Sequence, residues 1–171
     1  MKKIIVCGKY NAGKTTFIKN INPERFTGTE VNEVDLTTLE EKNSTTTVGV
    51  EVNFLTVNGI EFMFIGVPGQ ERFNFLWEIV GGHFDGIIFL HPAHEKTEEL
   101  EKIVKFFSKL PSFEKAKKRI FITFPDALTN PSSLLSTLKK LNIPFEVIDP
   151  RDRERVKAAA ESIAKEILLD Y

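Results

Sequence analysis

The amino-acid sequence predicts an α/β domain with a six-stranded, mostly parallel sheet, one antiparallel edge strand and helices on both faces. Short apolar runs alternate with amphipathic stretches along most of the chain. A glycine-containing loop joins the first apolar run to the first helical stretch, and a hairpin signal follows it. The hairpin accounts for the single antiparallel strand. A length of 171 residues favours one domain over residues 1–171.

The expected elements follow one another in a regular order. Residues 3–7 are an apolar run typical of a buried strand, and a helix is expected from Thr16 onward. Residues 48–65 alternate in part around Asn58-Gly59, a dipeptide that favours a hairpin turn. The remaining buried strands are expected near residues 84–90, 119–124 and 145–148. Amphipathic helices are expected near residues 94–110, 131–141 and 152–169.

The loop after the first strand carries the strongest chemical signal. Residues Gly8 to Thr15, with the sequence GKYNAGKT, match the phosphate-binding pattern G-x-x-x-x-G-K-[ST]. Between a strand and a helix, such a loop directs backbone N–H groups and a helix dipole at one place. Nucleotide phosphates fit that place, with Lys14 reaching the outer phosphates and the Thr15 hydroxyl reaching a magnesium ion. The predicted contacts from this region are Gly8, Asn11, Ala12, Gly13, Lys14, Thr15 and Thr16.

A chance glycine loop is the alternative interpretation. Glycine makes up only about 7% of ordinary protein composition. Two glycines at fixed positions followed by Lys-Thr therefore arise rarely by accident, and nucleotide binding is favoured.

Charge and composition exclude several other classes of function. The 23 basic and 24 acidic residues leave a formal charge of −1, so no overall field favours nucleic acid or a membrane surface. The single cysteine, Cys7, lies in the first apolar run and is expected to pack in the core of a protein from a reducing compartment. The sequence shows no apolar run long enough to span a bilayer, no signal peptide and no lipidation motif. We expect a cytoplasmic protein with no direct membrane anchor.

The order of the motifs resembles the Ras/Rab/Arf class of small GTPases, including bacterial and archaeal members. A phosphate-binding loop is followed by a Thr-rich segment, a hairpin and then the string PGQERF at Pro68 to Phe73. The resemblance covers essentially the whole chain and implies a P-loop NTPase fold. It also implies a GTP-binding molecular switch with GTP or GDP and Mg²⁺ as ligands. A protein effector or regulator would contact residues 27–47 and 66–82.

The resemblance assigns roles to residues beyond the loop. Thr47 takes the place of the switch threonine, which would bind magnesium together with Thr15 and sense the terminal phosphate. Gln70 would position the attacking water, with Lys14 as the other catalytic group, and Gly69 would donate a backbone N–H to the terminal phosphate. A Thr-rich entry into a strand and a Gly-Gln helix start are the corresponding structural alternatives. Residues 27–46 are expected to form a loop, or to contain a short helix.

Base recognition is expected after the strand near 119–124. The family carries Asn-Lys-x-Asp where this chain has Thr123-Phe124-Pro125-Asp126. Asp126 would accept hydrogen bonds from guanine, and Phe124 would stack on the base where the family has the lysine stem. In the final loop Arg151 would pack on the base, since Pro150 offers no N–H.

Two further departures bear on turnover. Gly66 stands where the family has the aspartate that helps to hold the magnesium shell through water. Asp35 and Glu71 are candidate replacements, and the bulky Tyr10 lies in the loop near the terminal phosphate. These departures predict a weak GTPase with slow hydrolysis. A pseudo-GTPase that binds nucleotide without useful hydrolysis is the alternative function, and a P-loop phosphotransferase is a third.

Overall fold

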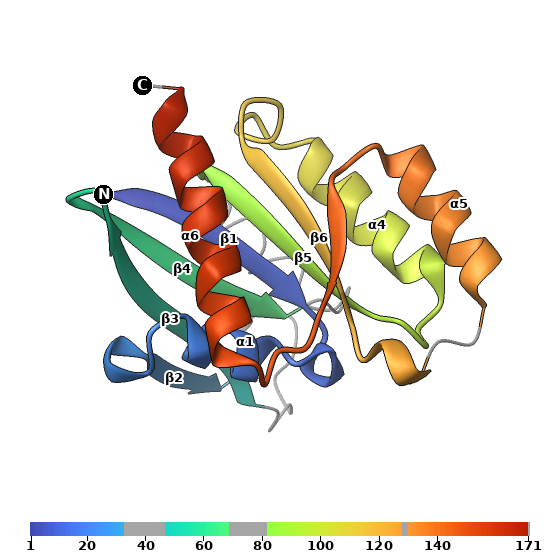
Figure 1. Cartoon of the computed structure of the whole chain (residues 1–171), viewed down its shortest axis with the longest axis horizontal. Coiled ribbons are helices and arrows are strands. Elements are labelled where there is room, and N and C mark those ends of the chain that lie inside the picture. The colour runs from blue at the N-terminus through green and yellow to red at the C-terminus, as the bar shows by residue number, and fades with distance from the viewer. Residues whose placement is uncertain (33–46, 69–81, 128–129, 171) are drawn as a thin grey trace.

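The computed structural model describes residues 1–32, 47–68, 82–127 and 130–170. They form a seven-stranded sheet in the order β2-β3-β4-β1-β5-β6-β7 with helices on both sides (Figure 1). The strands are β1 Lys2–Gly8, β2 Thr27–Asn32, β3 Thr47–Val57, β4 Ile60–Pro68, β5 Gly86–Pro92, β6 Lys117–Thr123 and β7 Phe145–Ile148. The α-helices are α1 Lys14–Ile21, α4 Thr97–Ser108, α5 Pro131–Leu141 and α6 Arg153–Leu169. The 3₁₀ turns are η1 Tyr10–Ala12, η2 Pro23–Arg25 and η4 Pro125–Ala127.

The predicted α/β fold is confirmed, but the predicted count of six strands is wrong. β2 lies within residues 27–46, which the sequence predicts as a loop, and it pairs antiparallel with β3 from Thr27 opposite Val52 to Asn32 opposite Thr47. β3 is antiparallel to both its neighbours, while β4, β1, β5, β6 and β7 run parallel. The antiparallel strand is therefore second from the edge, and β2 is the edge strand. Its polar sequence suits an edge, where one side of the strand has no partner strand in the sheet.

The predicted hairpin is confirmed and joins β3 to β4. Asn58 and Gly59 have φ of 50° and 78°, both in the left-handed region. Such a pair forms the tight turn whose twist matches two antiparallel strands. The turn fixes the register that places Glu51 of β3 opposite Gly66 of β4.

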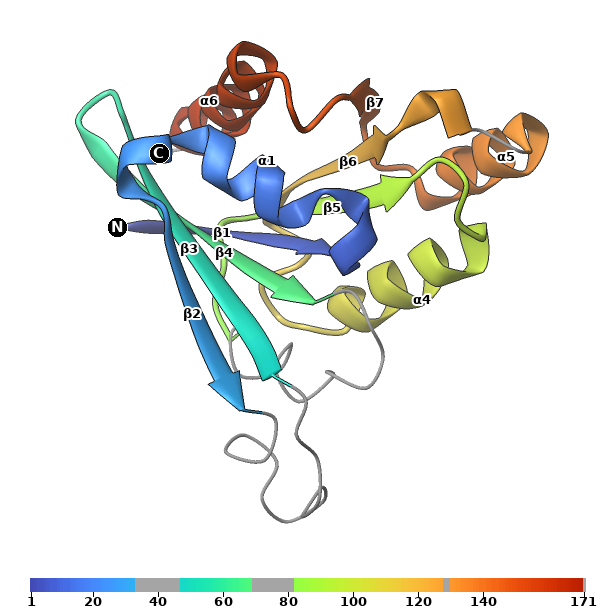
Figure 2. The same ribbon diagram turned by 90° about the horizontal axis from the view of Figure 1, so that it is seen from below.

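Two hydrophobic cores lie on the two faces of the sheet. Helices α1 and α6 cover one face and α4 covers the other, as the edge-on view shows (Figure 2). Alternation along the central strands separates the two cores, because successive side chains point to opposite faces. In β5, Ile88 and Leu90 join the core under α1 and α6, whereas Ile87 and Phe89 join the core under α4 and α5. This two-sided burial explains why the parallel strands appear in the sequence as continuous apolar runs.

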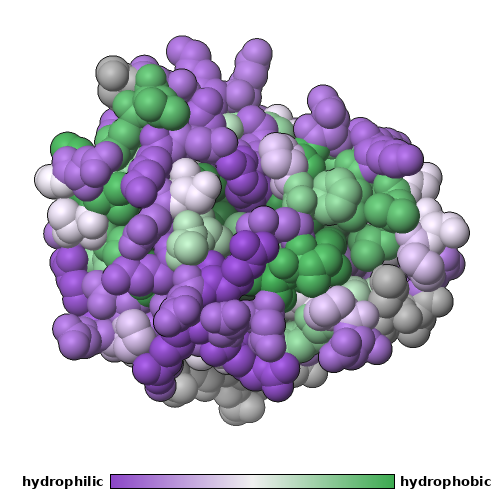
Figure 3. All heavy atoms as spheres, in the orientation of Figure 1, coloured by the Kyte–Doolittle hydropathy of each residue, from purple (hydrophilic) through white to green (hydrophobic). Residues whose placement is uncertain are grey.

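The far edge of the sheet, β7, is partly apolar on its surface. Hydrophobic side chains gather over β7 and toward α5 in the space-filling view (Figure 3). Phe145 and Val147 of β7 are 43% and 50% exposed, and Ile148 is buried. The strand is only four residues long, which keeps this second edge short.

Candidate phosphate-binding site

The glycine loop lies at the carboxyl end of β1 and leads through η1 into α1. Gly13 has a φ of +82°, and a Cβ added to it would lie 2.7 Å from the Pro150 Cγ. Glycine is therefore required both by the backbone conformation and by the close approach of Pro150. The Phe17 N–H donates to the Gly13 carbonyl at 2.8 Å, which starts the helix. No side chain of the described residues caps the first turn of α1, so its N–H groups are available to an anion.

The first two residues of α1 converge on one carboxylate. The Lys14 Nζ lies 2.8 Å from Oε2 of Glu51, and the Thr15 hydroxyl donates to Oε1 of the same side chain. The Lys14 side chain is 7% exposed and that of Glu51 is 13% exposed, so the ion pair is largely shielded from water. The two groups predicted to reach a phosphate and a metal ion are thus directed at a single anionic position. Glu51 is not among the residues that the sequence predicts for the site.

Gly66 leaves open the space beside the Glu51 carboxylate. A Cβ added to Gly66 would lie 2.3 Å from Ile18 Cδ1, 3.3 Å from Glu51 Oε2 and 3.4 Å from Lys14 Nζ. Any larger residue at position 66 would therefore press on α1 and on the ion pair. Gly66, which stands where the family has an aspartate, and Glu51 on the neighbouring strand are therefore part of the same local packing.

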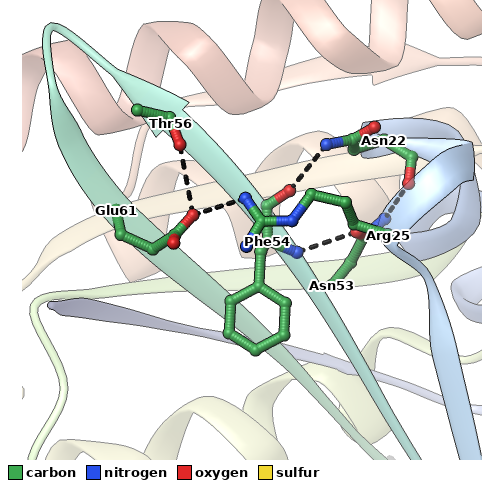
Figure 4. A network of polar contacts seen from close by, with 6 residues as sticks. All are labelled: Asn22, Arg25, Asn53, Phe54, Thr56 and Glu61. Atoms are coloured by element: carbon green, nitrogen blue, oxygen red, sulfur yellow. Dashed lines mark hydrogen bonds and ion pairs between the residues drawn. The ribbon is translucent and has the colours of Figure 1, made fainter.

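A second polar residue on the same face of β3 fixes this strand against α1. Asn53, fully buried, donates through Nδ2 to the carbonyls of Ile18 at 2.7 Å and Asn22 at 3.0 Å. Asn22 in turn donates to the Phe54 carbonyl at 3.0 Å, so the end of α1 and β3 hold each other at several points (Figure 4). Residues 51 and 53 share a face because side chains alternate along a strand. Asn53 therefore positions the strand segment that presents Glu51.

An outer ion pair extends the network that Figure 4 shows. Arg25 contacts Glu61 of β4 at 2.5 Å, and the Thr56 hydroxyl donates to the same carboxylate at 3.2 Å. The guanidinium carbon also lies 5.0 Å from the centre of the Phe54 ring. The hydrogen bond from Arg25 lowers the pKa of Glu61. Both side chains are about two-fifths exposed, so this pair adds little stability.

Glu95, just after β5, holds the glycine loop from the other side. It accepts from Asn11 Nδ2 at 2.9 Å and contacts Lys9 Nζ at 3.3 Å. The hydrogen bond from Asn11 is the main reason why the pKa of Glu95 lies below its ordinary value. Thr123, which stands where the family has the asparagine of Asn-Lys-x-Asp, has a buried hydroxyl with no hydrogen-bond partner within the described ranges. The loop is therefore braced, but by a residue that the sequence did not indicate.

The residues expected around the base lie at the same end of the sheet. Phe124 has a φ of 54°, and its Cζ would lie 3.3 Å from a Cβ added to Gly13, so the ring packs against the loop. Asp126 lies exposed in η4. Arg151 is bound in a fork by Asp149 at 3.0 Å, which raises the pKa of its guanidinium, and the charge of Asp126 adds to this shift.

Several predicted residues lie outside the part of the chain that the structure describes. Gln70, Gly69, Asp35 and Glu71 lie outside the described residues. The backbones of Tyr10 and Thr47 belong to η1 and β3, but their side chains are not among those that the structure describes. Of the predicted partner segments, only residues 27–32, 47, 66–68 and 82 are described.

The donor set at the loop fits magnesium held jointly with a nucleotide. The oxygens at hand are the Thr15 hydroxyl and the Glu51 carboxylate, both hard ligands of the kind that Mg²⁺ takes together with phosphates. Among the described residues, no three His, Cys, Asp or Glu side chains gather as a ready-made metal site. The residues described here thus suit a metal that arrives with phosphates, not one bound by protein ligands alone.

A groove of about 660 Å³ lies elsewhere, at the amino ends of β5 and β6. His83, Asp85 and Lys117 are among the residues that line it, and none of its lining residues belongs to the glycine loop. In parallel sheets, ligands bind outside the carboxyl ends of the strands. The loop, and not this groove, is therefore the candidate site.

The phosphate loop lies at the carboxyl end of β1, on a mostly parallel sheet with one antiparallel strand. This combination defines a small-GTPase-like P-loop domain. The model of the ADP-ribosylation factor family matches residues 1–128. The chain therefore belongs to the ADP-ribosylation factor family, as the predicted resemblance to small GTPases of the Ras/Rab/Arf class implies.

Curated relatives match at moderate identity. An uncharacterized protein of Methanocaldococcus jannaschii is 30% identical over 105 residues, which cover 60% of this chain and 59% of that protein. ADP-ribosylation factor-related protein 1 of Rattus norvegicus is 27% identical over 114 residues, 65% of this chain and 51% of the relative. The chain thus spans between half and three-fifths of the length of these relatives.

Solved structures share the fold. The Arl6 BBS3 small GTPase from Trypanosoma brucei, with the bound nucleotide analogue GppNp, superimposes with a TM-score of 0.72 at 17% identity and covers 99% of both chains. The cytosolic domain of the T. maritima FeoB iron transporter, in its GMPPNP form, gives a TM-score of 0.63 at 15% identity and covers 98% of this chain and 64% of that one. At the level of the fold, both agree with the sheet and helices described above. No helix formed by the described residues is long and apolar enough to cross a membrane.

Proposed function

We propose that the protein is a GTP-binding molecular switch that hydrolyses GTP slowly. One observation carries the proposal: the Lys14 amine and the Thr15 hydroxyl, at the start of a helix with uncapped N–H groups, are directed at the same anionic position. A nucleotide's outer phosphates match that position in charge and in hydrogen bonding. Family membership and nucleotide-bound neighbours of the same fold support the choice of ligand.

The resemblance to small GTPases supports the roles proposed for the other residues. Thr15 and Thr47 would hold Mg²⁺, which would supply positive charge between the phosphates when bound. Gln70 would orient the attacking water, and Gly69 would donate an N–H to the terminal phosphate. Asp126 would select guanine, because a carboxylate that loses its donors on binding adenine is costly. Phe124 already packs on Gly13, so it is close enough to the loop to stack on a base.

Nucleotide binding requires a rearrangement of the ion pair. The Lys14 Nζ pairs with Glu51 at 2.8 Å, and the phosphates would have to take the place of that carboxylate. Part of the binding free energy is therefore spent on separating a largely buried ion pair. This cost favours moderate affinity over very tight binding.

Hydrolysis is expected to be slow because Gly66 stands where the family has an aspartate and because the bulky Tyr10 lies in the loop near the terminal phosphate. We expect turnover at or below about 10⁻⁴ s⁻¹, the order seen in small GTPases without an activator. Multiple-turnover phosphate release measures this rate, with Gln70→Ala as the test variant. A wild-type rate well above that value without a partner protein would contradict the proposal.

The switch itself requires that the terminal phosphate change residues 27–47 and 66–82, where we expect a protein effector or regulator to bind in the cytoplasm. Hydrogen exchange of the protein loaded with GDP or with a non-hydrolysable GTP analogue tests this directly. We expect slower exchange in both segments with the analogue. Identical exchange with the two nucleotides would favour the second candidate below.

A pseudo-GTPase without useful hydrolysis is the second candidate. The observation that favours it is the Glu51 carboxylate bound to Lys14 and Thr15, together with the glycine at position 66. Nucleotide binding without detectable phosphate release would support it. A P-loop phosphotransferase is the third candidate, and tight adenine-nucleotide binding would favour it.

A further inference from the structure

We infer that Glu51 of β3 acts as the carboxylate that helps to hold the water shell of magnesium. It would replace the family's aspartate, in whose place β4 of this chain has Gly66. The inference rests on the proposed function, because it concerns the same nucleotide site. Its first support is the register: residues 51 and 66 are directly paired across the two strands. The Glu51 carboxylate is thus carried by the strand next to β4, at the same level along the sheet as residue 66.

The second support is the space around residue 66. Adjacent strands lie about 4.8 Å apart, so a side chain from β3 must be long to reach the space above β4. Glutamate has the length, and the glycine leaves the space open. A side chain at 66 would meet the Glu51 carboxylate and the Lys14 amine at 3.3 and 3.4 Å from its Cβ. The Glu51 carboxylate therefore lies next to the place where a side chain at residue 66 would begin.

The third support is the choice of partners. Glu51 accepts from the Thr15 hydroxyl, the P-loop group expected to bind the metal, and neutralises Lys14 with its other oxygen. With nucleotide and Mg²⁺ bound, the phosphates would take the place of Glu51 at Lys14. Glu51 would remain beside Thr15, where its carboxylate would accept hydrogen bonds from water on the metal.

This role differs from that of a simple competitor for Lys14. A competitor weakens nucleotide binding equally with and without Mg²⁺, and its removal strengthens both. A metal-shell carboxylate makes nucleotide binding depend on Mg²⁺, and its removal reduces that dependence. The ratio of the two affinities therefore separates the two roles.

The test is calorimetric titration of the full chain with GDP, in Mg²⁺ and in EDTA. We expect Mg²⁺ to tighten GDP binding to the wild type by at least about tenfold, a change of about 1.4 kcal/mol. In Glu51→Gln the dependence should fall below about threefold, while the affinity in EDTA stays equal or rises, since Lys14 is released. Glu61→Gln is the matched control, because it removes another β-strand carboxylate that pairs with Arg25, away from the loop. It should keep the wild-type ratio.

A variant that moves the carboxylate back to β4 tests whether a loss of Mg²⁺ dependence in Glu51→Gln reflects the missing carboxylate. Glu51→Gln combined with Gly66→Asp returns a carboxylate to β4, and Ile18→Val removes the Cδ1 atom that a Cβ at position 66 would meet at 2.3 Å. This triple variant should regain at least about half of the Mg²⁺ dependence on a logarithmic scale. Thermal unfolding checks that each variant is folded.

The outcomes are distinct. A Glu51→Gln protein that keeps the full Mg²⁺ dependence, or that gains affinity equally in both buffers, overturns the inference and leaves the proposed function in place. A wild type that binds GDP equally well in Mg²⁺ and EDTA also overturns the inference alone. A wild type that binds no guanine nucleotide in either buffer overturns the proposed function, and the inference with it.

Discussion

Asn53 offers a test of how β3 is held against α1. The substitution Asn53→Ala removes an amide that donates to the Ile18 and Asn22 carbonyls at 2.7 and 3.0 Å. Ile18 lies in the last turn of α1, where a backbone carbonyl has no partner within the helix. The side chain is fully buried, so water cannot replace the lost donors without entering the core.

The magnitude follows from these two hydrogen bonds. A buried acceptor left without a partner costs about 1–3 kcal/mol. Here one buried acceptor, at Ile18, and one partly buried acceptor, at Asn22, lose their donor. Partial relaxation of the end of α1 lowers the sum, so we expect about 2–4 kcal/mol of lost stability. For a chain of this size each kcal/mol shifts Tm by about 2–4 °C, which gives a fall of about 5–15 °C.

Urea and thermal unfolding of the nucleotide-free protein measure the effect. Thr56→Ala is the control, because it changes an exposed residue of the same strand whose hydroxyl donates at 3.2 Å to Glu61. We expect the control to stay within about 0.5 kcal/mol of the wild type. A loss below about 1 kcal/mol for Asn53→Ala would refute the reasoning that this residue fastens β3 to α1.

Three further changes test the packing around the loop. Gly66→Ala should lose about 1–3 kcal/mol in urea unfolding, because its Cβ would lie 2.3 Å from Ile18 Cδ1, and Ile18→Val should recover part of the loss; equal stability of Gly66→Ala and wild type would count against the close fit. Glu95→Gln should cost about 1 kcal/mol at neutral pH by weakening the bond to Asn11. The folded-state pKa of Glu95 is lowered from 4.5, so its contribution to stability is present above that pH and is lost as the pH falls through the lower folded value. The stability of Glu95→Gln should therefore depend less on pH in acid than that of the wild type. Burial raises the pKa of Cys7, so iodoacetamide should modify the thiol only at the rate of unfolding, and rapid labelling of the native protein would contradict its burial.

The sequence predicts the parts of this fold that depend on local pattern. The glycine loop, the Asn58-Gly59 hairpin and the buried strands each carry their own signal within a few residues. β2 carries no such signal, since most of its residues are polar and its pairing with β3 supplies the stabilisation. Tertiary pairing thus overrides weak local propensity at the sheet edge.

The residues of the candidate site also differ in whether a local sequence pattern predicts them. Lys14 and Thr15 follow from the motif, whereas Glu51 depends on the register between β3 and β4, which brings it opposite Gly66. One signal was available: Glu51 and Asn53 are polar residues on the strand face where Leu55 and Val57 are buried. Glu95 is 84 residues from Asn11, and no local pattern connects them.

The proposed function requires that the loop bind a guanine nucleotide. Calorimetric titration of the wild type with GTP, GDP, ATP and ADP in Mg²⁺ tests it most directly, with Asp126→Ala as the companion variant. We predict binding of GTP and GDP at least about a hundredfold tighter than of ATP and ADP, and loss of this preference in the variant. Equal or tighter binding of the adenine nucleotides, or no binding of any of the four, would contradict the claim.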